Sequence, residues 1–93
     1  MKLKLSQRHD IEYHMRKASE QGTENNPVKI YLTIIRNRNV PKHLQKTYET
    51  KTLEHPQDTC ILVEVPTKNL RNLIDDSYVL GYEWSEELKA LAN

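Results

Sequence analysis

The sequence predicts a single small α+β domain, with an antiparallel sheet of three to four strands and helices packed on one face. The chain has 93 residues, which is enough for one domain but not for two. Apolar residues alternate with a period of two in residues 28–36 and 59–65, as they do in strands. Around Ile11 and Leu70 they recur every three or four residues, as they do on the buried side of a helix.

The first expected elements are a short strand and a helix. Residues 1–5 alternate leucine with lysine, which predicts a strand. Ser6 is a suitable N-cap for a helix whose apolar face is formed by Ile11, Met15 and Ala18, at the spacing i, i+4, i+7.

Three consecutive strands are expected in the middle of the chain. Residues 28–36 carry apolar side chains on both faces, which indicates a central strand, and residues 59–65 are a second buried strand. Residues 46–53 are rich in threonine and tyrosine but polar, which is typical of an edge strand. Residues 37–44 are interpreted as a connection and residues 55–58 as a turn. Because these connections are short, the three strands are predicted to form an antiparallel meander.

The C-terminal part is expected to be mainly helical. Thr67 is a candidate N-cap for a second helix over Leu70 and Leu73, and Ser85 for a short last helix. Between them, residues 78–84 form an aromatic stretch. The predicted order is therefore strand, helix, three strands, helix, short helix. The core is expected to contain Ile30, Leu32, Ile34, Ile61 and Val63 from the strands, with Ile11, Met15, Leu70 and Leu73 from the helices.

Composition excludes several classes of protein. The two glycines, Gly22 and Gly81, are too few for a P-loop or a dinucleotide-binding loop. The one cysteine, Cys60, excludes an internal disulfide framework, a multi-cysteine zinc site and a redox cysteine pair. No apolar run is long enough to cross a bilayer. We therefore expect a cytoplasmic protein that uses no cofactor, no metal and no membrane.

Charge is segregated along the chain, although the net charge is only +1. Residues 25–48 contain no acidic residue, and residues 75–87 contain no lysine or arginine. If these two segments lie on different faces, they can meet across a two-fold axis, with each contact made twice. The pattern predicts a homodimer, unless the two charges neutralise one another within one fold.

The favoured function is binding without catalysis. Tyr and Trp are the residues that dominate binding energy at interfaces, and three of them fall within residues 78–84. The sequence predicts a small regulator, inhibitor or adaptor that binds another protein, of the kind common among phage and mobile-element accessory proteins. The expected contact residues are Tyr78, Tyr82, Glu83, Trp84 and Glu86. The opposing interpretation is that these aromatic residues fill the core of a chain that lacks phenylalanine.

Two alternatives remain. The basic segment, 29–46, is a candidate nucleic-acid-binding surface, because two arginines two positions apart point the same way on an extended chain. Its contact residues would be Arg36, Arg38, Lys42 and Lys46.

The remote alternative is a metal-dependent nuclease, in which Glu49 and Lys51 on one strand act with Glu64 on the next. The three-residue pattern of Glu49 and Lys51 is common on exposed strands. Cys60 has no base specified beside it. We therefore expect that the protein is not an enzyme.

Overall fold

The structure, a computed structural model, describes residues 9–84 and confirms the predicted α+β class. The described part contains three α-helices, one short 3₁₀ helix and a four-stranded antiparallel sheet. The predicted strand over residues 1–5, the Ser6 cap and the last short helix lie outside the described residues. In chain order, the elements are α1 (His9–Gln21), β1 (Pro27–Ile34), α2 (Val40–Tyr48), β2 (Lys51–Gln57), β3 (Cys60–Pro66), η2 (Thr67–Asn69), α3 (Leu70–Asp75) and β4 (Val79–Trp84).

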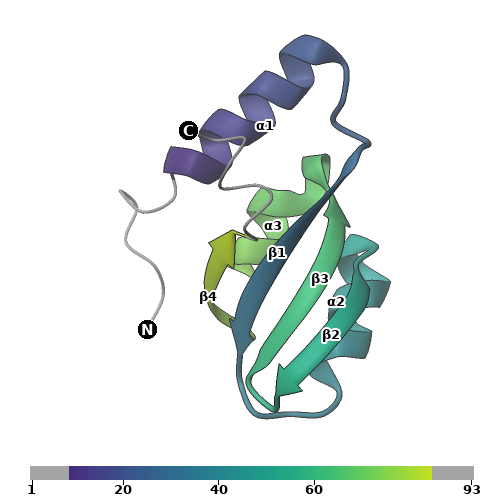
Figure 1. Cartoon of the computed structure of the whole chain (residues 1–93), viewed down its shortest axis with the longest axis vertical. Coiled ribbons are helices and arrows are strands. Elements are labelled where there is room, and N and C mark those ends of the chain that lie inside the picture. Colours follow the sequence, from purple (N-terminus) through teal and green to yellow (C-terminus); the bar gives the residue numbers. More distant parts are fainter. Residues whose placement is uncertain (1–8, 85–93) are drawn as a thin grey trace.

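The strand order is β2-β3-β1-β4, so the predicted meander is wrong. β3 lies between β1 and β2 and is antiparallel to both, so β1 and β2 run in the same direction and are joined through α2. In the same way, β1 lies between β3 and β4, which are joined through α3. Two such split βαβ units make the βαββαβ arrangement of ferredoxin-like domains. In Figure 1 the sheet is seen from the front, with α2 and α3 behind it and α1 at one end.

Helix α2 replaces the predicted connection and the first part of the predicted edge strand. Val40 and Leu44 are buried and Tyr48 is half-buried, at the i, i+4, i+8 spacing of a helix face. Pro41 does not interrupt the helix because it lies in the first turn, where its missing N–H has no helical partner. The threonine and tyrosine that favoured a strand are thus on a helix, and β2 begins only at Lys51.

The structure differs from the prediction in three other details. β2 continues through the predicted turn to Gln57, and the reversal is at Asp58 and Thr59. The aromatic stretch, 78–84, becomes the edge strand β4. Thr67 does not cap a helix: its hydroxyl donates a hydrogen bond to the Asn26 carbonyl at 2.8 Å and ties the end of β3 to the loop before β1.

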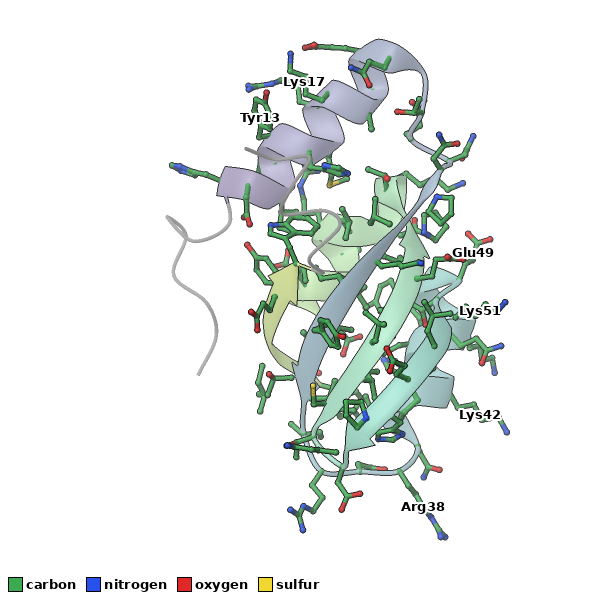
Figure 2. All side chains as sticks on the ribbon, viewed as in Figure 1. Tyr13, Lys17, Arg38, Lys42, Glu49 and Lys51 are labelled. Carbon is green, nitrogen blue, oxygen red and sulfur yellow. The ribbon has the colours of Figure 1, made fainter. Side chains whose placement is uncertain are left out.

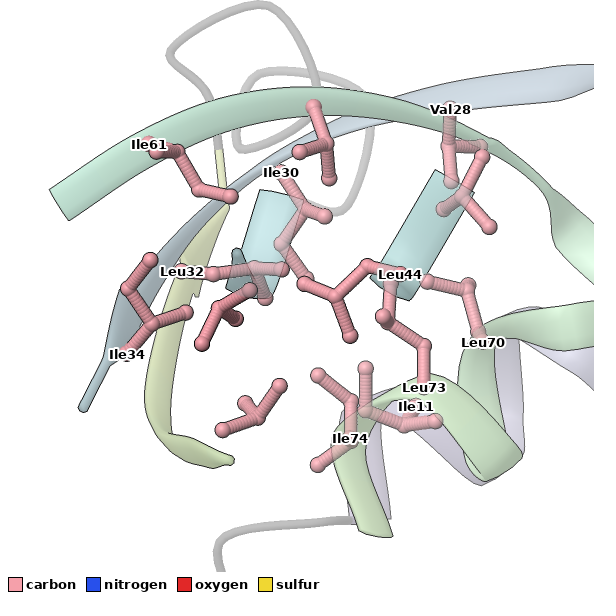
Figure 3. Packing of buried hydrophobic residues seen from close by; sticks show 14 residues of the cluster. Ile11, Val28, Ile30, Leu32, Ile34, Leu44, Ile61, Leu70, Leu73 and Ile74 are labelled. Atoms are coloured by element: carbon pink, nitrogen blue, oxygen red, sulfur yellow. The ribbon is translucent and has the colours of Figure 1, made fainter. Parts of the chain in front are cut away.

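Burial of β1 alternates strictly, because the helices described within residues 9–84 cover only one face of the sheet. Ile30, Leu32 and Ile34 are fully buried, whereas Lys29 and Thr33 on the other face are exposed and Tyr31 is half-buried. The core therefore forms one layer between the sheet and the helices, as Figure 3 shows. All of the predicted core residues belong to it, Met15 at its border, and α2 and β4 add Val40, Leu44 and Val79. No helix within residues 9–84 is long and apolar enough to cross a membrane.

We expect Leu32→Ala to lower the free energy of unfolding by about 2–5 kcal/mol, since it removes a fully buried side chain and leaves a cavity. Urea unfolding followed by circular dichroism measures this. Thr33→Ala is the matched control on the exposed side of the same strand, and we expect a change within about 0.5 kcal/mol. Equal losses in the two variants would mean that the strand faces the other way.

The C-terminus of α2 contains the one described residue other than glycine with a positive φ. Glu49 has φ 61° and ψ 35°, the left-handed conformation in which a helix commonly ends on glycine. Its N–H donates to the Gln45 carbonyl at 3.0 Å and closes the helix. A side chain at this position costs conformational energy that glycine would not.

We therefore expect Glu49→Gly to raise the free energy of unfolding by up to about 1 kcal/mol. Gln45→Gly, one turn earlier on the exposed side of the helix, is the control and should lower it by about 1 kcal/mol. Urea unfolding of both variants is the measurement. A loss of stability in Glu49→Gly would contradict this account of how the helix ends.

Candidate functional site

Two of the predicted contact residues, Tyr82 and Trp84, bind α1 within the fold. In the register of β4 with β1, Tyr82 is opposite Leu32 and Trp84 is opposite Ile30, so both side chains lie on the helix side of the sheet. The Tyr82 hydroxyl donates to Asp10 Oδ1 at 2.5 Å, and Trp84 Nε1 donates to Asp10 Oδ2. Both aromatic residues are half-buried against the core. They therefore have a structural function that favours the core-filling interpretation.

The other predicted contact residues are dispersed. Glu83 is exposed and lies on the opposite side of β4 from Tyr82 and Trp84. Tyr78 lies just before β4, with 38% of its surface exposed. Glu86 lies outside the described residues. The structure therefore does not bring the four described residues of this set together on one surface.

The basic segment is also divided between surfaces. Arg36 and Arg38 lie in the bend and turn between β1 and α2 and not on an extended chain, so the argument for two parallel arginines is wrong. Lys42 and Lys46 are exposed one turn apart on α2. Figure 2 shows Arg38 and Lys42 projecting outward from the molecule. Lys29 lies on the sheet itself.

Only two of the three proposed nuclease residues lie on neighbouring strands. Lys51 is opposite Glu64 in the register of β2 and β3, as expected. Glu49, however, is the C-cap of α2 and precedes the strand, so the premise that placed it beside Lys51 on one strand is wrong. Within residues 9–84, no group of three or more His, Cys, Asp or Glu side chains is placed to hold a metal ion.

The two charged segments meet within one chain at Asp76. The Asp76 carboxylate, whose side chain is 7% exposed, lies 2.9 Å from His43 Nε2 and accepts a hydrogen bond from the Tyr48 hydroxyl at 2.6 Å. Its other oxygen accepts from the Tyr78 N–H at 2.8 Å. Asp76 thereby ties α2 to the turn between α3 and β4. This contact was not predicted, because Tyr48 and His43 precede Asp76 by 28 and 33 residues in the sequence.

Burial alone would raise the pKa of Asp76, but the hydrogen bonds from Tyr48, Tyr78 N–H and His43 outweigh it and leave the pKa below its ordinary value. Burial and the same hydrogen bond raise the pKa of Tyr48 to about 12, so its hydroxyl keeps its proton and donates at neutral pH. His43 and Tyr78 also border a hollow of 240 Å³, together with Asn37, Asn39 and Val40. A histidine held by a carboxylate is the arrangement of a general base, but here the pair also joins a helix to a turn.

In Figure 1, none of the helices within residues 9–84 lies over the front of the sheet, which we call the open face. Its central pair is Tyr31 on β1 opposite Leu62 on β3. Leu62 is only 8% exposed, although no helix within residues 9–84 covers this side. In the register, the other residues of the open face are Lys29, Thr33, Lys51, Glu54, Gln57, Cys60, Glu64, Gly81 and Glu83.

The open face thus has an apolar centre within a charged border. Next to the central pair, Glu64 lies between Lys29 and Lys51, so one row across three strands alternates in sign. On the other side of the pair, Cys60 lies opposite Thr33 and is half-exposed, less buried than predicted. An apolar centre with a polar border is typical of surfaces that bind proteins. The alternation in residues 28–36 could have indicated an exposed face, but both faces of this strand were predicted to be buried.

We expect Asp76→Asn to lower the free energy of unfolding by about 1–2 kcal/mol at neutral pH, because hydrogen bonds to a charged group are the stronger ones. A carboxyl group whose pKa is lowered on folding stabilises the folded state at pH values above its pKa in the unfolded chain. This contribution is lost as the pH falls through the lower pKa of the folded state. The difference from the wild type should therefore shrink once the pH falls below about 4, the ordinary pKa of an aspartate. Urea unfolding as a function of pH measures it.

Asp58→Asn, in the exposed turn between β2 and β3, is the control for removing one carboxylate. It should change the stability by no more than about 0.5 kcal/mol at neutral pH. An Asp76→Asn variant as stable as the Asp58→Asn variant would show that Asp76 does not hold the two elements together.

Comparisons with protein-family models, with curated proteins and with solved structures found no match.

Proposed function

We propose that the protein is a non-catalytic binding module, a regulator, inhibitor or adaptor, that docks on another protein through the open face. The observation that carries this proposal is the central pair, Tyr31 and Leu62, on a side of the sheet that no described helix covers. A tyrosine at the centre of a surface gives much contact area for little lost side-chain entropy, and such aromatic residues dominate binding energies.

The border of the open face indicates the chemistry of the partner. Three carboxylates, Glu54, Glu64 and Glu83, outnumber the two lysines, Lys29 and Lys51. A phosphate backbone would be repelled by this border, whereas a protein surface with apolar residues at its centre and lysine or arginine around them would fit. The partner is therefore a protein with a basic border. The free thiol of Cys60 suits the reducing cytoplasm, where we place the complex.

Binding through the open face also leaves the fold intact. The residues that hold the helices to the sheet all lie on the other side, so a partner gains contact without competing with the core. The surface predicted from the sequence does not have this property, because Tyr82 and Trp84 are held by Asp10.

Site-specific photo-crosslinking in cells of the source organism tests the proposal. A benzophenone amino acid at position 31 is expected to give a discrete cross-linked protein, and Leu62→Ala in the same chain should reduce it. The control is the same group at position 13, because Tyr13 is 52% exposed on α1, away from the sheet (Figure 2).

The outcomes separate the candidate functions. A product at position 31 that nuclease treatment leaves unchanged supports a protein partner. A product that nuclease removes, or one that forms through position 42 and not 31, would favour the nucleic-acid alternative through Lys42 and Lys46. Equal labelling at positions 13 and 31 would contradict the assignment of the open face.

For a partner so identified, we expect Tyr31→Ala to weaken binding by at least about fivefold, since truncating a central aromatic residue commonly costs more than 1 kcal/mol. Tyr13→Ala should bind as the wild type does. Isothermal titration calorimetry measures both, after circular dichroism has shown that each variant is folded. Unchanged affinity in Tyr31→Ala would remove the central pair from the interface.

A further inference from the structure

We infer that the segment of the partner that lies on the open face is an amphipathic α-helix that crosses the strands. Its face toward the sheet carries basic residues at positions i and i+11 and apolar residues at i+4 and i+7. The inference rests on the proposed function, because it takes the open face as the docking surface and names the element of the partner that fits it. One row of residues across the four strands carries the argument.

This row, which we call the central row, has a carboxylate at each end and two apolar side chains between them. In the register, its members on β2, β3, β1 and β4 are Glu54, Leu62, Tyr31 and Glu83. Two copies placed row on row would bring carboxylates against carboxylates in either direction. The charge pattern therefore fits a different chain that has basic residues at the two ends and apolar residues at the centre.

The open face determines which kind of backbone can lie on it. It presents side chains to a partner, whereas the backbone groups of its strands are directed at neighbouring strands. A partner segment that covers Tyr31 must therefore satisfy its own N–H and C=O groups, which are costly to bury unpaired. A helix does this internally, and an extended segment does not. Helices are also the usual cover for the second face of a sheet.

The spacing of the strands sets the spacing of the contact residues on the helix. Adjacent strands are about 4.8 Å apart, so the two carboxylates of the central row are separated by about 14 Å. On a helix with a rise of about 1.5 Å per residue, positions i and i+11 are about 16 Å apart, and i+4 and i+7 lie between them on the same face. With the two centres aligned, each position is within about 1 Å of one strand.

The neighbouring rows exclude a helix that is basic along its whole length. The row toward one side contains two lysines with a carboxylate between them: Lys51, Glu64 and Lys29. These lysines are about 7 Å from the central row, close enough to repel further basic residues. The row toward the other side carries no charge in the register. The surface therefore selects a helix with basic residues at the two ends of the contact only.

Two helical peptides of equal composition test the order of the contact residues. The ordered peptide, of about 20 residues, carries lysine at i and i+11 and leucine at i+4 and i+7, with alanine and glutamine elsewhere. The exchanged peptide has lysine and leucine in each other's places. We expect the ordered peptide to bind at least about fivefold more tightly, because only its lysines reach both carboxylates. Fluorescence anisotropy of the end-labelled peptides at low salt measures this.

Charge reversal tests the two ends of the central row. A third peptide carries glutamate at i and i+11. We expect the double variant Glu54→Lys, Glu83→Lys to prefer this peptide over the ordered one by at least about fivefold, the reverse of the wild type. The control, Glu20→Lys with Asp58→Lys, changes the net charge equally at two exposed positions outside the row and should keep the preference of the wild type. Circular dichroism shows that both variants are folded.

The results distinguish this inference from the proposed function. Equal binding of the ordered and exchanged peptides, or no binding of the ordered peptide at about 1 mM, would overturn the inference. So would unchanged binding after two prolines interrupt the helix of the ordered peptide. A cross-link from position 31 to a protein in cells would stand in each of these cases. A preference for the ordered peptide with no cross-linked protein would instead support the helix as ligand and remove the proposed function.

Discussion

The structure depends on the antiparallel pairing of β1 with β3 in a single register. Pairing Ile30 with Val63 and Leu32 with Ile61 turns every large aliphatic side chain of these pairs toward the helices. The same register necessarily turns Lys29 and Tyr31 to the other side, because side chains alternate along a strand. A shift by one residue would exchange the two faces. The core and the open face are therefore two consequences of one pairing.

Long-range polar contacts hold the helices in place around this pair of strands. Asp76 ties α2 to the turn before β4, and Asp10 holds β4 to α1 through Tyr82 and Trp84. On α1 and α3, Glu12 and Arg71 form a two-point ion pair. In a chain with only 37% hydrophobic residues, such contacts supplement a core that has a single layer. Because Tyr82 and Trp84 of β4 are hydrogen-bonded to Asp10 within the fold, we propose the open face, and not these aromatic residues, as the binding surface.

Local periodicity was enough to predict the helices and strands whose buried residues recur at a regular spacing. Ile11 and Ala18 indicated α1, and alternating aliphatic residues indicated β1 and β3. Helix α2 was missed because Pro41 and its threonine and tyrosine suggested a connection and a strand, although the Val40–Leu44 spacing was helical. Strand order was not predictable from short connections, since the crossover through α2 depends on where that helix packs. The candidate site was not predicted for a similar reason. The sequence shows that Tyr31 is on the opposite side of β1 from Ile30 and Leu32, but which side the helices cover depends on the whole fold.

The central claim is that the open face is the working surface of this protein. Hydroxyl-radical footprinting, which labels exposed side chains and is read by mass spectrometry, tests it most directly when the protein in its native cells is compared with dilute purified protein. The account predicts that Tyr31 is labelled less in cells, while Tyr13 on α1 is labelled equally in both samples. Protection around Lys42 and Tyr78, with Tyr31 labelled as strongly in cells as in dilute solution, would contradict it.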